Sequence, residues 1–136
     1  MKHSKPQSIL LVDDHAAVRH GLALVLTQEG LGACREAAGR EEALAAATSE
    51  PPDLAVVDLS PASDDALELV AELSARNIAV LVCSMCEDPG CVRRAMAAGA
   101  RGYITKPEAP PELARAVRGV LEGWMLISPR AAGGLR

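Results

Sequence analysis

Aromatic side chains are nearly missing from this sequence of 136 residues, which contains no phenylalanine, one tryptophan (Trp124) and one tyrosine (Tyr103). A platform on which nucleobases or a flavin stack needs several aromatic faces, so the composition argues against such a site. The hydrophobic core must therefore be built from alanine, valine, leucine and isoleucine, which supply most of the 49% hydrophobic content.

Long apolar runs are also missing, and no stretch approaches the roughly 20 apolar residues that span a membrane. The first residues, 1–6, are not followed by the apolar segment of a secretory signal, so we expect a cytoplasmic protein. A net charge of −4 argues against non-specific binding of nucleic acid by this chain. The length predicts one soluble domain that is large enough to bury a core.

Cysteine is scarce, with four residues in the chain, and Cys83 and Cys86 have a C-x-x-C spacing. This spacing is found in zinc sites and redox pairs, but here there is no second pair of the same kind. Cys83 closes an apolar run, which favours a small core residue at the end of a strand. Cys86 is then expected on the loop that follows.

Short apolar runs alternate with helical patterns along the chain. The expected strands cover residues 9–13, 31–38, 54–58, 78–83 and 102–104, and the second of them is weak and expected at a sheet edge. The expected helices lie around residues 18–26, 41–48, 67–74, 92–99 and 113–124, with Gly30 and Gly123 ending the first and the last. This alternation predicts an α/β fold of the flavodoxin-like, doubly wound (βα)5 type. It is a three-layer sandwich whose parallel five-stranded sheet has strand order 2-1-3-4-5.

Acidic residues follow two strands that this order makes neighbours. Asp13 and Asp14 end the first strand, and Asp58 ends the third, so the three carboxylates are expected to converge. At ~5 Å and an effective dielectric constant of ~20, each pair repels by roughly 3 kcal/mol. Oxygen ligands alone favour Mg²⁺, Mn²⁺ or Ca²⁺ over zinc. The alternative, that an acid only caps the next helix, would suit a single strand end better than two converging ones.

Two further groups at the same edge suit phosphoryl chemistry. Ser84 follows the fourth strand and supplies a hydroxyl, while Lys106 follows the fifth and supplies an ammonium group. Together with an aspartate nucleophile and a divalent cation, these are the groups that phosphoryl transfer requires.

As a set, these residues resemble the receiver domain (CheY-like) of two-component response regulators. Asp13 and Asp14 match the acidic pair of the family, Asp58 its phosphoacceptor, Lys106 its lysine, and Ser84 and Tyr103 its switch residues. The resemblance covers residues 7–125, with 1–6 expected as a flexible tail and 126–136 as the start of a linker or tail.

Four shorter motifs resemble one subclass of that family. They are Leu11-Val-Asp-Asp-His15, Ser84-Met85, Gly99-Ala-Arg-Gly-Tyr103 and Leu126-Ile-Ser-Pro129. In this subclass the receiver is followed by a C-terminal LuxR-type helix-turn-helix, which we do not find in this chain. Transcription regulation and DNA binding are therefore expected of an intact protein through that further domain.

The resemblance implies that a sensor histidine kinase passes a phosphoryl group to Asp58. It implies Mg²⁺ (or Mn²⁺) held by the carboxylates of Asp14 and Asp58, by Asp13 through water, and by the backbone carbonyl of Ser60. The only chemistry implied is self-phosphorylation and self-dephosphorylation, so the chain is not expected to be an enzyme in the usual sense.

The switch residues are expected to respond to the phosphoryl group. Lys106 would pair with it, Ser84 would hydrogen-bond to it, and Tyr103 would turn inward, which changes a surface that a partner or a second copy in a homodimer reads. Ser60 and Cys86 occupy positions that tune dephosphorylation in the family. An accessible Cys86 thiol would make the switch redox-sensitive, and the alternative is a passive loop residue.

The segment after Asp58 departs from the family pattern, because Pro61 comes one place early and Ala66 replaces a glycine. This motivates an alternative, a degenerate receiver that acts as a phosphorylation-independent interaction module. A second alternative, an aspartyl-phosphate phosphatase, would require an acid where Ser60 stands. The three histidines, His3, His15 and His20, are read as surface residues and not as metal ligands.

Overall fold

The computed structural model describes residues 7–59 and 64–133. Within these ranges six strands form one parallel sheet with the order β2-β1-β3-β4-β5-β6. The strands are β1 (Ser8–Val12), β2 (Ala33–Ala37), β3 (Leu54–Asp58), β4 (Ala79–Ser84), β5 (Gly102–Thr105) and β6 (Leu126–Ile127). The predicted order 2-1-3-4-5 is thus confirmed and extended by one short strand, and β2 lies at the predicted edge.

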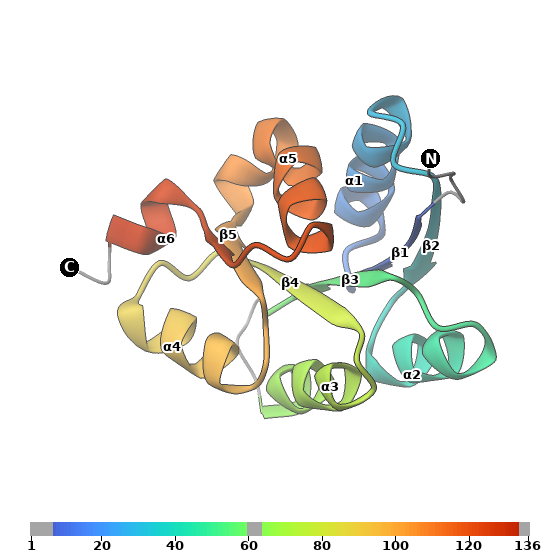
Figure 1. Ribbon diagram of the computed structural model, residues 1–136, viewed down its shortest axis with the longest axis horizontal. Coiled ribbons are helices and arrows are strands. Elements are labelled where there is room, and N and C mark those ends of the chain that lie inside the picture. Colours follow the sequence, from blue (N-terminus) through green and yellow to red (C-terminus); the bar gives the residue numbers. More distant parts are fainter. Residues whose placement is uncertain (1–6, 60–63, 134–136) are drawn as a thin grey trace.

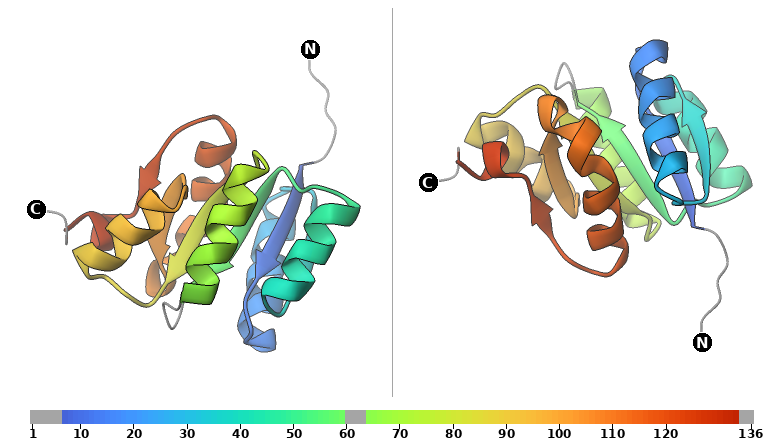
Figure 2. Two further views of the ribbon diagram at one scale, coloured as in Figure 1. Left: turned by 90° about the horizontal axis from the view of Figure 1, so that it is seen from below. Right: turned by 90° about the horizontal axis from the view of Figure 1, so that it is seen from above.

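Helices cover both faces of the sheet (Figure 1). On one face lie α1 (Ala16–Gln28) and α5 (Ala109–Leu121), and on the other lie α2 (Arg40–Ser49), α3 (Asp64–Ala75) and α4 (Pro89–Ala97). The two turned views show the same three layers from opposite faces (Figure 2). The predicted doubly wound α/β sandwich is confirmed. No helix in the described part is long and apolar enough to cross a membrane.

The apolar strands are buried on both faces, as their continuous hydrophobic runs require. Along β1, Leu10 and Val12 belong to the core beneath α2, α3 and α4, whereas Ile9 and Leu11 belong to the core beneath α1 and α5. Residues 9–12 are at most 6% exposed. The strand therefore delivers the acids that follow it to a fixed position at the edge of the sheet.

The end of the chain differs from the expectation. The helical pattern extends to Trp124, but α5 ends at Leu121, Gly123 takes a φ of 98° and Trp124 is 65% exposed. Where 126–136 was expected to begin a linker or tail, β6 pairs with β5 and α6 (Pro129–Gly133) follows. A strand of two residues is too short to show periodicity, so only its pairing with β5 reveals it.

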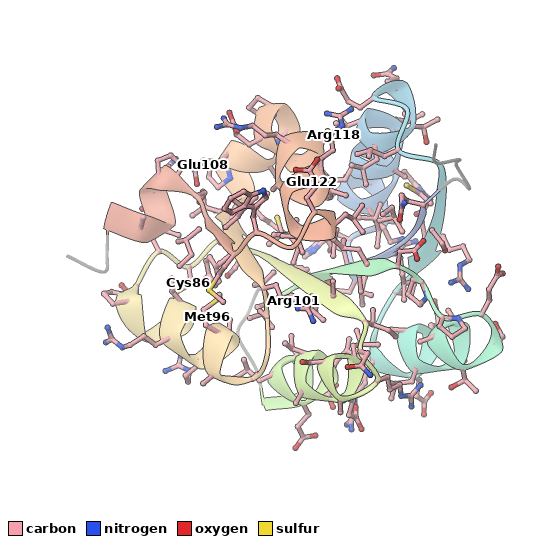
Figure 3. All side chains as sticks on the ribbon, viewed as in Figure 1. Cys86, Met96, Arg101, Glu108, Arg118 and Glu122 are labelled. Atoms are coloured by element: carbon pink, nitrogen blue, oxygen red, sulfur yellow. A yellow bond between two sulfur atoms is a disulfide. The ribbon has the colours of Figure 1, made fainter. Side chains whose placement is uncertain are left out.

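Glu108 attaches this last segment to the domain. It lies in the single turn η1 (Lys106–Glu108) and beside α6 (Figure 3). Its carboxylate accepts hydrogen bonds from the hydroxyls of Thr105 at 2.6 Å and Ser128 at 2.5 Å, and from the Arg130 amide at 3.1 Å. Burial opposes ionisation, but these donors together hold the pKa of Glu108 below its ordinary value.

We expect Glu108→Ala to lower the free energy of unfolding by about 1 to 2 kcal/mol, because the buried hydroxyls of Thr105 and Ser128 lose their acceptor. Since the folded-state pKa is lowered, this contribution is complete above the ordinary value of 4.5 and is lost as the pH falls through the folded value. Urea titrations at neutral pH and at about pH 3 measure both effects. Glu112→Ala, which removes a carboxylate on α5 that is 41% exposed and pairs with Arg115, is the control, and an equal loss in both variants would contradict the assignment.

Two glycines explain the Gly99-Ala-Arg-Gly-Tyr103 motif. Gly99 has a φ of 116°, and a Cβ there would come within 2.6 Å of Ser74 on α3. A Cβ on Gly102 would lie 2.7 Å from a methyl carbon of Leu81 on β4. The motif thus lets the chain leave α4 tightly and bring β5 close to β4, which places Lys106 at the same edge as the acids.

Candidate functional site

The three predicted acids lie together. Asp13 and Asp14 follow β1 directly, Asp58 ends β3, and these strands pair in parallel with Val12 opposite Val57. Ligand atoms of Asp13, Asp14, His15 and Asp58 all lie within 4.8 Å of one another. The pairing of strands far apart in the sequence therefore creates one acidic cluster at the carboxyl edge of the sheet.

Lys106 bridges two of these acids. Its Nζ lies 3.2 Å from Asp13 Oδ2 and 3.1 Å from Asp58 Oδ2, and the three side chains are 15%, 6% and 5% exposed. Burial opposes the charge on Lys106, but the hydrogen bond and charge of Asp58 raise the pKa of the lysine. Burial likewise opposes the charge on Asp13, but the His15 amide and Lys106 hold the pKa of that carboxyl below its ordinary value. Asp13 and Lys106 are thus held in their charged forms.

Asp14 and His15 form the exposed side of the cluster. The side chain of Asp14 is 66% exposed and that of His15 is 63% exposed, with His15 Nδ1 at 3.0 Å from Asp14 Oδ1. The prediction that His15 lies at the surface is confirmed, and so is that for His20, which is 61% exposed; His3 lies outside the described residues. However, His15 also lies within reach of the acids, in the group of residues that could hold a metal ion. Its position directly after the acidic pair is the sequence feature that could have indicated this.

An open cavity of about 170 Å³ lies over the acids. Its wall includes Asp13, Asp14 and Asp58 together with Arg40 and Asp65. Arg40 crosses from α2 to α3, with Nη1 at 2.9 Å from Asp65 Oδ1 and Nη2 at 2.9 Å from Glu72 Oε2. Sequence reasoning missed this guanidinium, because nothing in the spacing of Arg40 links it to the acids.

The donor set fits a hard divalent cation. Three carboxylates within 4.8 Å carry three negative charges, and Lys106 offsets one of them. Oxygen donors with an open, solvent-facing side suit Mg²⁺, which retains several waters. Receiver domains generally bind Mg²⁺ at such an acidic pocket. The backbone carbonyl of Ser60, the remaining predicted ligand, lies outside the described residues.

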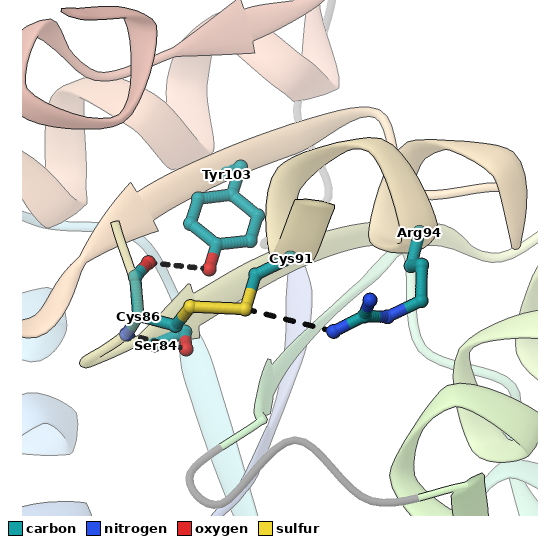
Figure 4. Close-up of a disulfide and its surroundings, with 5 residues drawn as sticks. All are labelled: Ser84, Cys86, Cys91, Arg94 and Tyr103. Atoms are coloured by element: carbon teal, nitrogen blue, oxygen red, sulfur yellow. Dashed lines mark hydrogen bonds between the residues drawn. A yellow bond between two sulfur atoms is a disulfide. The ribbon is translucent and has the colours of Figure 1, made fainter. Parts of the chain in front are cut away.

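The two predicted switch residues both bond to Cys86. The Cys86 amide donates to Ser84 Oγ at 3.0 Å, and the Tyr103 hydroxyl donates to the Cys86 carbonyl at 2.6 Å (Figure 4). Tyr103 is fully buried, and this burial raises the pKa of its hydroxyl. Ser84 ends β4 next to the strand that carries Asp58, since Asp58 pairs with Cys83. Tyr103 is thus turned inward, behind Ser84.

The cysteines partly contradict the sequence reading. Cys83 is a buried core residue as predicted, and burial raises the pKa of its thiol to about 12. Cys86, however, is not an accessible free thiol, because it forms a disulfide with Cys91. The C-x-x-C spacing therefore does not mark the bonded pair. Cys91 belongs to α4, and only the fold of the loop before α4 brings it to Cys86.

Comparisons with known proteins agree with this architecture. The family model described as "Response regulator receiver domain" matches residues 9–118. The chain is 36% identical over 127 residues to the response regulator GacA of Pseudomonas aeruginosa, which covers 91% of this chain and 59% of GacA. It is 42% identical over 123 residues to the transcriptional activator protein ExaE of Pseudomonas putida, covering 88% of this chain and 57% of ExaE.

Solved structures give the same result. A two-component response regulator of the LuxR family from Aurantimonas sp. SI85-9A1 matches with a TM-score of 0.87 and 30% identity, covering 96% of each chain. The signal receiver domain of the putative response regulator NarL from Mycobacterium tuberculosis matches with a TM-score of 0.79 and 25% identity, covering 88% of this chain and 99% of that one. This chain spans less than two thirds of the length of GacA and ExaE. The chain belongs to the family of receiver domains of two-component response regulators, and its relatives include transcriptional regulators.

Proposed function

We propose that Asp58 is the phosphoacceptor of this receiver domain. The observation that carries the proposal is the shared ion pair, in which Lys106 Nζ lies 3.1 Å from Asp58 and 3.2 Å from Asp13. This lysine lies at ion-pair distance from Asp58 and stands ready to pair with an oxygen of the incoming phosphoryl group. An Asp58 oxygen attacks the phosphorus of a phosphohistidine, the P–N bond breaks, and its electron pair stays on the imidazole nitrogen.

Mg²⁺ (or Mn²⁺) is the proposed cofactor, held by the carboxylates of Asp14 and Asp58, by Asp13 through water, and by the backbone carbonyl of Ser60. When bound, the ion would neutralise negative charge on the phosphoryl oxygens. Asp14 is the exposed ligand through which the site opens to solvent. The side chain of Asp13 is buried, as that of Asp58 is, and the His15 amide fixes Asp13 with a hydrogen bond of 2.8 Å to Oδ1.

The response is proposed to pass through Ser84 and Tyr103. The Ser84 oxygen accepts from the Cys86 amide, and its hydroxyl is proposed to donate its own proton to a phosphoryl oxygen when one arrives. Tyr103 packs behind Ser84, between β5 and α4, and a partner protein binds the surface that results. Ser60 and Cys86, each two residues beyond a key group, are proposed to tune the rate of dephosphorylation.

Receiver domains of response regulators act with sensor histidine kinases. For this chain we propose a sensor histidine kinase as phosphodonor, a homodimer that forms on phosphorylation, and a cytoplasmic location. Because the relatives include transcriptional regulators, we also propose that the output is transcription, through a DNA-binding domain outside this chain. Residues 7–125 remain the proposed receiver unit, with β6 and α6 packed on it. The family is one of signalling domains, so we propose no chemistry beyond gain and loss of the phosphoryl group.

We expect the chain to gain one phosphoryl group from a small acyl phosphate when Mg²⁺ is present, and none after chelation by EDTA. The physical reason is that two nearly buried acids and Asp14 repel an incoming anion unless a cation offsets them. Intact-protein mass spectrometry over time measures the adduct and its loss. Absence of any adduct with Mg²⁺ would favour a phosphorylation-independent interaction module, and continuous release of phosphate with many turnovers would favour a phosphatase.

A further inference from the structure

The proposed function makes no use of the disulfide between Cys86 and Cys91. Cys86 lies two residues after Ser84, and Cys91 is the third residue of α4, five positions further along the chain. Figure 3 places Cys86 beside α4. Both half-cystines are partly exposed, so a small thiol or disulfide in solution can reach the bond.

The backbone of Cys86 connects this bond to both switch residues. Its amide donates to Ser84 Oγ and its carbonyl accepts from the Tyr103 hydroxyl (Figure 4). The disulfide in turn ties Cys86 to the first turn of α4. When the pair is oxidised, Cys86, which holds Ser84 and Tyr103, is fixed to α4. When the pair is reduced, Cys86 belongs to a loop whose only covalent restraint is the backbone.

The surroundings of the pair suit thiol–disulfide exchange, whereas those of the other cysteines do not. Arg94 Nη2 lies 3.8 Å from Cys91 Sγ, and its positive charge stabilises the sulfur anion that leaves when the bond is reduced. Asp88, whose carboxylate lies within 4.8 Å of both sulfurs, partly offsets this effect. By contrast, Cys83 is 1% exposed, and Cys34 lies on β2 with a thiol whose pKa is raised by burial.

We propose that Cys86 and Cys91 form a reversible dithiol–disulfide pair whose oxidation by a small disulfide, such as glutathione disulfide, speeds phosphoryl acceptance at Asp58. The two thiols give up two electrons and two protons as the S–S bond forms. The S–S bond of glutathione disulfide breaks and takes them up, which yields two glutathione thiols. The first protein thiolate forms a mixed disulfide and releases one glutathione, and the second thiolate displaces the other.

Oxidation is expected to speed phosphoryl acceptance, and not to slow it, because the disulfide preorganises Ser84 and Tyr103. This expectation rests on the proposed function. With the bond intact, Cys86 holds the Ser84 oxygen by its amide and keeps Tyr103 inward by its carbonyl. A donor that is already in place needs no reorganisation when charge arrives on the phosphoryl oxygens. Reduction frees the loop, so Ser84 and Tyr103 sample more positions and the reactive arrangement is less populated.

The first experiment establishes the redox couple without reference to phosphorylation. The full chain is equilibrated in glutathione buffers from reducing to oxidising, trapped with iodoacetamide without denaturant, and analysed by peptide mass spectrometry. We expect Cys86 and Cys91 to be alkylated together in reducing buffers and protected together in oxidising buffers, whichever redox state the chain starts from. Cys83 should stay unlabelled in all buffers. A bond that resists reduction in the folded chain, or a Cys86 that pairs with another thiol, would overturn the proposal.

The second experiment compares phosphoryl uptake from an acyl phosphate with Mg²⁺ by the oxidised and the reduced chain. We expect the oxidised form to be faster by about threefold or more. Cys34→Ser should keep this difference. The double variant Cys86→Ser with Cys91→Ser should show the reduced rate in both buffers, and the comparison within the unaltered chain does not depend on how well that variant folds.

The outcomes separate the two proposals. Equal rates in both redox states, with the adduct on Asp58 present, would refute the proposed effect of the disulfide on phosphoryl acceptance and leave the phosphoacceptor assignment standing. No adduct in either state would refute the phosphoacceptor assignment and, with it, the proposed effect of the disulfide, whatever the first experiment shows. A faster reduced form would also overturn the proposal, because the bond would then restrain the switch instead of preparing it.

Discussion

Asp58→Asn is expected to abolish phosphoryl uptake, because an amide offers no carboxylate oxygen that can attack phosphorus and form an acyl phosphate. The change is nearly isosteric, and the new amide would remain beside Lys106 and Asp13, so the site keeps its shape. Removing one of three clustered negative charges should not lower the free energy of unfolding by more than about 1 kcal/mol when no metal is added. Intact-protein mass spectrometry with an acyl phosphate and Mg²⁺ measures the adduct, and a urea titration checks the fold.

The matched control is Asp65→Asn. Asp65 lines the same cavity, but it is 65% exposed and pairs with Arg40 instead of Lys106. This variant should take up the phosphoryl group. An adduct of normal yield in Asp58→Asn would show that the nucleophile lies elsewhere. Its loss in both variants would show that uptake depends on the acidic charge of the cavity and not on Asp58 in particular.

Lys106→Met is expected to lower the free energy of unfolding by about 2 to 4 kcal/mol without divalent metal, because it leaves two nearly buried carboxylates facing each other. This loss of unfolding free energy lies toward the lower end of the range for a buried ion pair that loses one partner, because the exposed Asp14 opens the cluster to solvent. Urea titrations of both proteins measure the difference. Mg²⁺ should stabilise the variant more than the native chain, because the ion then supplies charge that the lysine no longer provides.

The pH dependence of this difference has a defined sign. The pKa of Asp13 is lowered by folding, so its contribution is complete above the ordinary value of 3.8 and is lost as the pH falls through the folded value. The pKa of Lys106 is raised, so its contribution is complete below 10.5 and is lost as the pH rises through the folded value. The gap between the two proteins should therefore be widest between these limits. Arg93→Met, which removes an exposed cation on α4, should show no comparable change; an equal loss there would indicate a general charge effect.

Much of the site was predictable because the topology of a parallel sheet maps strand ends to one edge. Asp13, Asp58, Ser84 and Lys106 each follow an apolar run, and the doubly wound order brings those runs together. The hydrophobic runs are strong signals because burial on both faces leaves no room for polar residues. Placement of these four side chains therefore needed little beyond recognising the strands.

Other features depend on contacts between residues that carry no local pattern. Arg40 reaches the cavity only because α2 packs beside α3. The strand β6 exists because β5 offers an unpaired edge and Glu108 holds the segment that follows. Trp124 continues the helical period, yet Gly123 ends the helix region first and leaves the indole exposed.

The sequence by itself determined the α/β class, the order of the first five strands and the acidic edge, because each depends on hydrophobic periodicity and on the residues that directly follow a strand. Only the tertiary structure decided that Lys106 is shared between Asp13 and Asp58, since that requires three strand ends at ion-pair distance. It also decided that Cys86 pairs with Cys91 and stands between Ser84 and Tyr103. A disulfide forms where the fold of a loop brings two sulfurs together, and spacing along the chain does not specify that geometry.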